Sequence, residues 1–337
     1  GFRAGYNNAT MPALNQWFRR HRGLAMGLAG MGTAIGGTTI APLMGFLVLS
    51  AGWRPAAFIS GVIIITVVIP MSFLIRRDPE SMGLRPDGDP VPDDEINIAE
   101  VTANDSKDNE SERHGAAILH AGEPDFMASE AMRTPTFWML VLAVGMRNTV
   151  HSGTTFLMVP LSVWFLMGSG RSEDDAQPIA VAFVGVMSFS LLIMTPIVGW
   201  MGDRWSKKKL SSVCMIGGAL SLIMLVEDTG NIWQLVAFVV LLALSETANP
   251  LAWAIMGDYF GRRSYATLRG WQHLPDQFMS MSTPVWMGVI FDHTGSFKWA
   301  LVPLVIIYCL AAIFYWLIPN PRTPARVRAY REQGHLE

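Results

Sequence analysis

The stretch GWMGDRWSKKKL, residues 199–210, decides the fold of this chain. It separates two long apolar runs, residues 179–196 and 210–226. A short loop with four cations and one acid between two hydrophobic helices indicates a tight turn on one face of a membrane. Because Lys and Arg are enriched in cytoplasmic loops, these cations predict that this face is the cytoplasmic one.

The composition extends this interpretation to the whole chain. Of the 337 residues, 51% are hydrophobic and 15% are charged, whereas a soluble domain has about 25% charged residues. Of the 27 acids, 15 lie between residues 78 and 133. Outside that segment, long apolar runs alternate with short polar loops, which is typical of an all-α polytopic membrane protein.

The apolar runs predict nine membrane spans, since a spanning helix needs about 20 mostly apolar residues. Of the 25 Lys and Arg residues, 20 fall in alternate loops, 3 in the opposite loops, and Arg3 and Arg147 inside runs. This asymmetry predicts a multi-pass protein of the plasma (inner) membrane, with the loop 199–210 and the C-terminus cytoplasmic. The predicted spans are residues 1–18, 23–50, 54–75, 135–168, 177–201, 210–227, 232–257, 268–291 and 297–318.

An acidic segment divides these spans into three and six. Residues 78–133 are rich in Asp, Glu, Asn, Ser and Pro, which predicts a cytoplasmic linker that is partly disordered and ends in a short interfacial helix. Thr134 and Pro135 then predict a helix start, as an N-cap followed by proline at the first helical position. We therefore predict the remainder of an N-terminal helical half (1–77), the linker (78–133), a C-terminal six-helix half (134–319) and a cytoplasmic tail (320–337).

The second predicted span is rich in glycine at its start. Gly23 and Gly27 form one small-xxx-small pair, and Gly32 and Gly36 form another. Such pairs let a second helix approach closely, which matters in lipid because packing replaces the hydrophobic driving force. This span is therefore predicted to lie in a tightly packed bundle.

Several of these stretches resemble the major facilitator superfamily. Gly199, Asp203, Arg204 and Lys208 are similar to its cytoplasmic signature between helices 8 and 9. Its monocarboxylate-transporter-like and oxalate/formate-antiporter-like branch has junctions that resemble WFRRHRGLAMG (17–27), EAMRTPTFW (130–138), GDYFG (257–261) and FDHTGS (291–296).

The resemblance implies a twelve-helix fold in which the nine spans are helices 4–12 of an N-terminally truncated chain. It also implies two six-helix halves that rock around a central substrate site. The stretch MSMSTP (279–284) departs from the branch, where helix 11 often carries a Gly-Pro-rich sequence. Site details for that helix therefore do not transfer.

Arg147 is the first candidate for binding chemistry, because charges at membrane depth are costly and mark functional sites. It lies twelve residues after Pro135, about 18 Å into a core about 30 Å thick. Asn148 is its neighbour, and His151 shares its helical face. Since a guanidinium offers a bidentate fork, this group predicts a site for a carboxylate substrate. The alternative is that Arg147 forms a purely structural pair with a helix acid.

Glu246 is the only acid in its span, and Asn249 and Pro250 follow it. Proline frees a backbone carbonyl, which is tolerated in a membrane where the helix lines a cavity. We predict that Glu246 is either a carrier of the coupling proton, because burial favours a protonated carboxyl, or the permanent counter-ion of Arg147. Asn249 is predicted to contact substrate.

Two further groups are candidates for the same pathway. His273, Asp276 and Gln277 share one face of the next span and predict a proton relay or gate, or alternatively a polar cluster that fixes helix packing. Arg3, Asn7 and Asn8 in the first span predict the opposite wall of a substrate path, unless that edge of the span faces water.

The loop 199–210 predicts a conformational latch. An acid such as Asp203 can cap a neighbouring helix N-terminus or pair with an Arg, and its release would let two halves separate. Gly199, Arg204 and Lys208 belong to the same loop. The partners that we predict for the latch are Arg262, Arg263 or the start of the span at Leu268.

Other chemistry has no carrier in the sequence. The motifs GxxxxGK(S/T), HExxH and GxSxG do not occur, so neither a nucleotide-driven pump, an enzyme nor a cofactor is predicted. Cys214 and Cys309 lie in apolar runs and suggest neither a disulfide framework nor a metal site. The basic loops lack interleaved aromatics, so nucleic-acid binding is not predicted.

We predict a secondary active transporter of small, monocarboxylate-like organic anions, working by alternating access coupled to protons or to counter-substrate. Its predicted partners are the lipid bilayer, the substrate and, in the first coupling mode, protons. A proton-coupled exporter of lipophilic compounds that uses Glu246 is one alternative. A non-transporting membrane sensor or scaffold is another.

Overall fold

The computed structural model describes residues 7–73, 76, 79, 82, 84–89, 126–227, 229–322 and 324. Arg3, the middle of the predicted linker and most of the predicted tail lie outside these residues, as do the side chains of Asn7 and Asn8. Every regular element of the described part is a helix. The interfacial helix predicted near residues 126–132 corresponds to α9 (Ala128–Met132).

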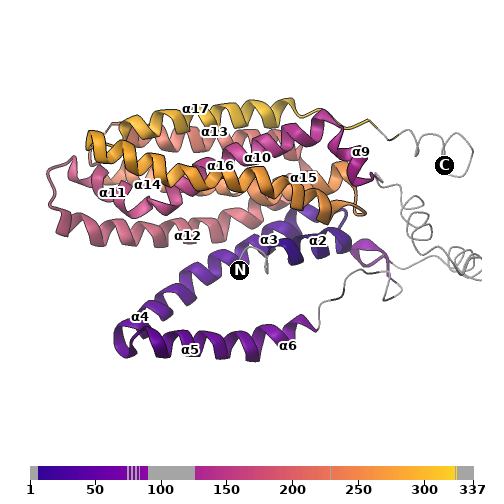
Figure 1. Cartoon of the computed structure of the whole chain (residues 1–337), viewed down its shortest axis with the longest axis horizontal. Coiled ribbons are helices and arrows are strands. Elements are labelled where there is room, and N and C mark those ends of the chain that lie inside the picture. The colour runs from indigo at the N-terminus through magenta and orange to yellow at the C-terminus, as the bar shows by residue number, and fades with distance from the viewer. Residues whose placement is uncertain are drawn as a thin grey trace, which may run out of the picture.

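The helices form two groups along the chain (Figure 1). The first group comprises α2 (Asn7–Trp17), α3 (Arg22–Ile35), η1 (Gly36–Ile40), α4 (Ala41–Ala51), α5 (Trp53–Ile63), η2 (Ile64–Val68) and α6 (Ile69–Ser72), followed by the short η4 (Pro86–Gly88). After α9, the second group comprises α10 (Pro135–Phe156), α11 (Met158–Met167), α12 (Glu173–Arg204), α13 (Lys207–Val226), α14 (Ile232–Glu246), α15 (Ala248–Phe260), α16 (Tyr265–Thr294) and α17 (Lys298–Leu317).

Among the described residues, five helical stretches are long and apolar enough to cross a membrane, and six if the bent pair α10 and α11 is one span. Two of the five join neighbouring elements, α5 to α6 as Trp53–Ser72 and α14 to α15 as Ile232–Phe260. They support a multi-pass membrane protein but leave the count of nine as a prediction. Within the described part of the chain, the runs 1–18, 23–50 and 268–291 are not among these helices. In the described part of the first run, residues 7–18, the helix is α2, which has 11 residues.

The run 135–168 was predicted as one span, and the structure divides it into two helices. It is broken at Leu157, and the helices on either side of the break, α10 and α11, meet at a bend of 65°. Pro160 explains the break, because proline has no N–H to donate to the carbonyl of Phe156, four residues earlier. The predicted start of this run is confirmed, since the hydroxyl of Thr134 accepts a hydrogen bond from the backbone N–H of Phe137 at 3.3 Å.

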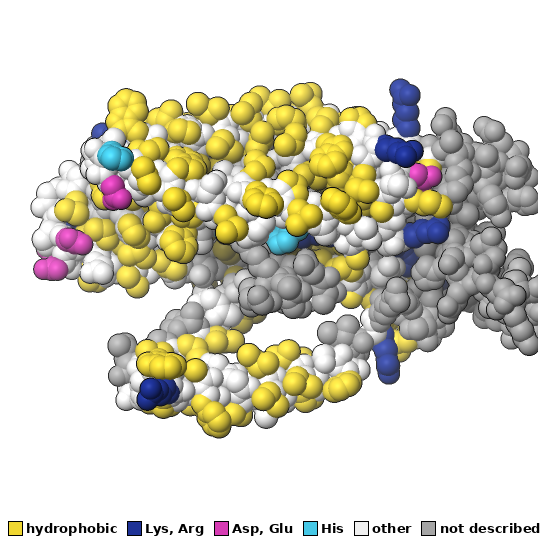
Figure 2. All heavy atoms as spheres, in the orientation of Figure 1, with side chains coloured by type: hydrophobic (Ala, Val, Ile, Leu, Met, Phe, Trp, Pro, Cys, Tyr) yellow, Lys and Arg dark blue, Asp and Glu magenta, His cyan; other side chains and the backbone are white. Residues whose placement is uncertain are grey.

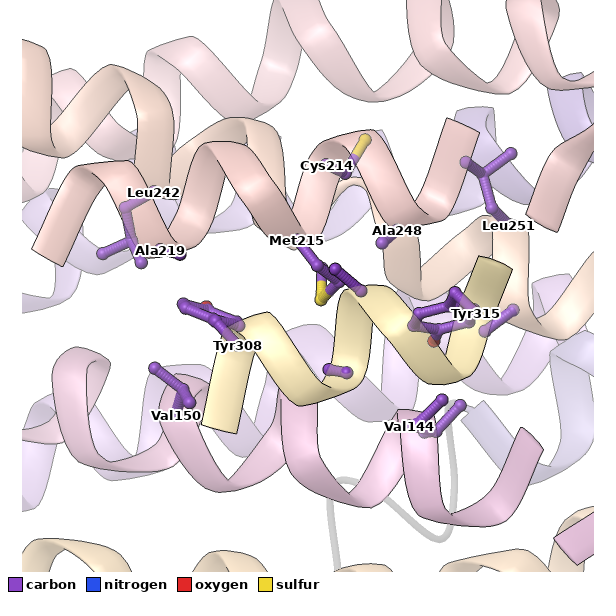
Figure 3. Close-up of a cluster of buried hydrophobic side chains, with 14 of the residues drawn as sticks. Val144, Val150, Cys214, Met215, Ala219, Leu242, Ala248, Leu251, Tyr308 and Tyr315 are labelled. Atoms are coloured by element: carbon purple, nitrogen blue, oxygen red, sulfur yellow. The ribbon is translucent and has the colours of Figure 1, made fainter. Parts of the chain in front are cut away.

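The core of the second group is a layer of apolar and aromatic side chains between helices. Figure 3 shows side chains of α10, α13, α14, α15 and α17 meeting around Tyr308 and Tyr315, both fully buried. The hydroxyl of Tyr308 shares a hydrogen bond with that of Ser245 at 3.0 Å. This hydrogen bond ties the end of α14, next to Glu246, to α17.

The outer surface is apolar over most of its length. Large side chains such as Phe278, Trp233 and Phe58 are more than two-thirds exposed, and yellow apolar atoms cover the sides of the bundle in Figure 2. Dark-blue Lys and Arg side chains gather mainly at the end of the molecule where α9 lies. An apolar belt with cations gathered at one end fits a protein surrounded by lipid.

Helices α3 and α12 cross at very short range through glycine. A Cβ on Gly199 would lie 2.6 Å from the carbonyl oxygen of Gly23, and one on Gly27 would lie 2.9 Å from that of Thr195. The pair Gly23 and Gly27 therefore packs as predicted. The pair Gly32 and Gly36 does not, because a Cβ on Gly36 would meet no atom within 4 Å.

Substituting alanine at the glycine contact is expected to destabilise this crossing. Gly199→Ala places a methyl against backbone that cannot move aside, so we expect a loss of about 1–3 kcal/mol in the free energy of unfolding. Gly185 is in the same helix, and a Cβ added there would meet no atom within 4 Å. Gly185→Ala should therefore be neutral or slightly stabilising, because alanine has a higher helix propensity than glycine. Thermal unfolding of both variants in detergent tests this, and equal melting temperatures would contradict it.

Candidate functional site

The central feature of the second group is a buried ion pair between α10 and α14. Nη2 of Arg147 contacts Oε2 of Glu246, and the two side chains are 3% and 6% exposed. The same nitrogen donates to the backbone carbonyl of Glu246 at 3.3 Å. Burial makes such a pair costly to break, because either charge left alone would lack both water and counter-charge.

His151 extends the pair along α10. Its Nδ1 lies 2.8 Å from Oε2 of Glu246, and its side chain is 28% exposed. His151 lies one helical turn after Arg147, on the same face of α10. Both side chains therefore contact the same oxygen, Oε2 of Glu246. The other oxygen, Oε1, and Nε of Arg147 are buried without a hydrogen-bond partner in the described structure.

Helix α16 supplies the second half of the cluster. Nδ2 of Asn148 donates to Oδ1 of Asp276 at 2.7 Å, and Oδ1 of Asn148 accepts from Nη1 of Arg147. Nδ1 of His273 lies 3.4 Å from Oδ2 of Asp276, with the two side chains 33% and 6% exposed. Asn148 therefore bridges Asp276 of α16 and Arg147, which in turn contacts Glu246. We call the whole set the central polar cluster: Arg147, Asn148, His151, Glu246, His273 and Asp276.

Some predicted site residues are not joined to this cluster. Asn249 and Gln277 are half-buried, and in the described part of the chain neither hydrogen-bonds to a cluster member. Arg3 and the side chains of Asn7 and Asn8 lie outside the described residues. Asn249 lies two residues after Thr247, the residue that separates α14 from α15.

Asp203 lies at the end of α12 and binds the N-terminus of α3. Its Oδ1 accepts from the backbone N–H of Gly23 at 2.7 Å, and its Oδ2 from that of Leu24 at 2.8 Å. A carboxylate is stabilising at this place, because the first N–H groups of a helix have no partner within the helix and carry partial positive charge. The partners predicted for Asp203, near Arg262, Arg263 or Leu268, are therefore wrong.

Asp258 of α15 joins this contact through two cations. Nη1 of Arg22 lies 2.7 Å from Oδ1 of Asp258, and Nζ of Lys207 lies 2.8 Å from its Oδ2. Lys207 also lies 3.4 Å from Asp203. We call Arg22, Asp203, Lys207 and Asp258 the latch network. Sequence reasoning missed Arg22, Lys207 and Asp258 as members, although the charge pattern of WFRRHRG and GDYFG was visible.

The other residues predicted for the latch have separate contacts. The guanidinium of Arg204 stacks over the ring of Trp200 at 3.9 Å. Nζ of Lys208 donates to the carbonyl of Ile318, just after α17, at 2.7 Å. Gly199 makes the close contact with Gly23 described above. The contact of Arg204 thus lies within α12, and Lys208 holds α13 to the end of α17, whereas Gly199 and Asp203 hold α12 against α3.

A second carboxylate holds the turn that precedes α3. Asp87 in η4 accepts from the backbone N–H groups of Arg19 and Arg20, at 3.2 and 2.9 Å. Its side chain is 8% exposed, and its φ of 64° is unusual for a residue other than glycine. The two carboxylates thus bind successive N–H groups on either side of His21.

Comparison with known proteins agrees with this architecture. The family model described as Major Facilitator Superfamily matches residues 1–187 and 172–336. The chain is 20% identical over 311 residues to the probable galactarate/D-glucarate transporter GudP of Escherichia coli, covering 90% of this chain and 65% of that protein. It is 21% identical over 312 residues to Monocarboxylate transporter 6 of Homo sapiens, covering 91% of this chain and 57% of that protein.

The chain thus spans about 65% and 57% of the length of these two relatives. The family match, in contrast, covers nearly every residue of the chain. Apolar helices, the glycine-mediated contact of α3 with α12 and the carboxylate at the start of α3 are consistent with that match. The chain belongs to the Major Facilitator Superfamily.

Proposed function

We propose that this chain works as a secondary active transporter of small organic anions, coupled to protons. The observation that carries the proposal is the buried contact of Arg147 with Glu246 inside the central polar cluster. A guanidinium at this depth is a strong anchor for a substrate carboxylate, because the low-dielectric surroundings strengthen charge-assisted hydrogen bonds.

The charges of the cluster favour protons as the coupling ion. One cation, Arg147, contacts Glu246 and is linked through Asn148 to a second acid, Asp276. An added carboxylate would bring a third negative charge beside one cation. Protonation of Glu246 removes one of these charges and leaves Arg147 available for the substrate. Proton and anion would then bind together.

The names of the relatives support the substrate class. One is named for galactarate and D-glucarate and the other for monocarboxylates, so both names refer to carboxylates. The proposal includes the predicted division of the chain into two helical parts joined by residues 78–133, with the linker and the C-terminus cytoplasmic. It also includes the latch network as the contact that holds the cytoplasmic side closed.

Uptake in proteoliposomes that contain the full-length protein tests the proposal. We expect an inward proton gradient to stimulate uptake of at least one of labelled galactarate, D-glucarate and lactate. Glu246→Gln should abolish that stimulation while counterflow exchange of the same compound persists, because a neutral side chain mimics the protonated state. Glu173→Gln, an exposed acid in the first turn of α12, is the matched control and should behave as wild type.

Two results would overturn the proposal. Absence of uptake of all three carboxylates would remove the substrate class and turn the search to lipophilic compounds. Stimulation by the gradient that survives Glu246→Gln would assign the proton to another group or the coupling to a counter-substrate.

A further inference from the structure

Pro250 lies three residues after Thr247, the one residue that separates α14 from α15 in the apolar helical stretch Ile232–Phe260. Helix α14 ends at Glu246, and α15 begins at Ala248. In a continuous helix the backbone N–H of residue 250 would donate to the carbonyl of residue 246. Proline has no N–H, so the carbonyl oxygen of Glu246 is free to accept a hydrogen bond from elsewhere.

The group that uses this carbonyl is the guanidinium of Arg147. Its Nη2 donates to the Glu246 carbonyl at 3.3 Å and also contacts Oε2 of the same residue. Its Nη1 donates to Asn148, the next residue on its own helix. Glu246 therefore holds Arg147 through two different oxygens, one of the side chain and one of the backbone.

From this arrangement we infer that Pro250 is a positioning residue for Arg147, an inference that rests on the proposed role of Arg147 as the substrate cation. The carboxylate of Glu246 loses its charge when it is protonated, whereas the carbonyl oxygen does not titrate. When proton binding weakens the ion pair, the carbonyl keeps Nη2 in place. The substrate then meets a guanidinium that is already oriented, which preserves affinity.

A packing role for the proline ring is the competing explanation. Pro250 is buried, and its Cγ lies 3.3 Å from the position that a Cβ would occupy on Gly30 of α3. A ring that only packs against α3 would influence the contact between helices and hence the rate of conformational change. The missing N–H would influence the position of Arg147 and hence substrate affinity. The two roles therefore predict different kinetic changes.

Pro250→Ala in the full-length protein, reconstituted in liposomes, separates these roles. The alanine N–H can bond to the Glu246 carbonyl, so we expect KM for the transported carboxylate to rise about tenfold, the effect of one hydrogen bond to a charged group, with kcat nearly unchanged. A backbone ester with lactic acid at position 250 has the same methyl group but no N–H, and should restore the wild-type KM. Pro303→Ala, at an exposed proline in α17, is the matched control.

Either of two kinetic results would overturn the inference. The first is a wild-type KM in Pro250→Ala, and the second is a raised KM in both the alanine and the ester variant. If the alanine variant does not fold, the ester variant alone tests the inference. A wild-type KM in the ester variant supports the role of the missing N–H, and a tenfold rise in its KM contradicts that role. A cryo-EM structure of Pro250→Ala gives a readout that needs no transport, since Nη2 of Arg147 should have left the Glu246 carbonyl. If wild type transports none of the carboxylates, the proposed function fails while this structural arm still tests the effect of Pro250.

Discussion

Replacing Arg147 with Gln is expected to lower the free energy of unfolding by about 3–5 kcal/mol, because it leaves Glu246 buried without its cation. Arg147 and Glu246 are 3% and 6% exposed, so water cannot take the place of the lost partner. The same variant should reduce carboxylate uptake at least about a hundredfold, since a buried charge-assisted contact to substrate is worth several kcal/mol. Denaturant unfolding in detergent and uptake in liposomes are the two measurements.

The double variant Arg147→Gln with Glu246→Gln is the internal control for this prediction. Two neutral amides of similar shape can satisfy each other, so the double variant should recover a large part of the lost stability but no uptake. Stability that is unchanged in the single variant would show that Glu246 is not dependent on Arg147. Recovery of both stability and uptake in the double variant would show that the pair is structural, which is the alternative raised from the sequence.

Asp203→Asn is expected to open the contact between α3 and α12. The amide oxygen can accept only one of the two N–H groups of Gly23 and Leu24, and the negative charge at the start of α3 is lost. Loss of a helix cap of this kind costs about 2 kcal/mol, which corresponds to a shift of about thirtyfold toward the open state. Lys207 also loses one of its two acidic neighbours.

Alkylation of a cysteine introduced at Asn15 measures this opening. Asn15 in α2 is fully buried and donates to the carbonyl of Gly261 at 3.5 Å, so a cysteine there is reached only when α2 and α15 separate. In a Cys309→Ala background, which removes the exposed native cysteine, Asp203→Asn should raise the labelling rate about thirtyfold. Asp174→Asn, at the opposite end of α12 and exposed, should leave it unchanged. Equal rates in both variants would contradict a latch at Asp203.

The candidate site shows how far residue patterns reach. The depth of Arg147 and Glu246 in their spans, and the shared face of Arg147 and His151, follow from helix geometry and were predictable. That Arg147 and Glu246 touch was one of two alternatives, because the residues are 99 positions apart and lie on different helices. Only the tertiary arrangement of the bundle, which places the end of α14 beside Arg147 of α10, brings them together.

The helix breaks show a second limit. Hydropathy is continuous through residues 135–168, so the run was predicted as one span although Pro160 interrupts its hydrogen bonding. The same sequence signal, proline inside an apolar run, occurs at Pro178, Pro196, Pro275, Pro284 and Pro303, where α12, α16 and α17 continue unbroken. The group that a freed carbonyl binds depends on the surrounding helices, as the guanidinium of Arg147 at the carbonyl of Glu246 shows.

The sequence by itself determined the membrane class, the apolar helices and the cationic loop at residues 199–210. These follow from local composition, because a bilayer excludes unpaired backbone groups and charges from its core. Only the tertiary structure decided that Asp203 binds the start of α3, that Gly23 and Gly27 pack while Gly36 does not, and that Pro250 leaves a carbonyl to Arg147. Each of these depends on which helices lie side by side, and partners separated by up to 180 residues leave no local pattern.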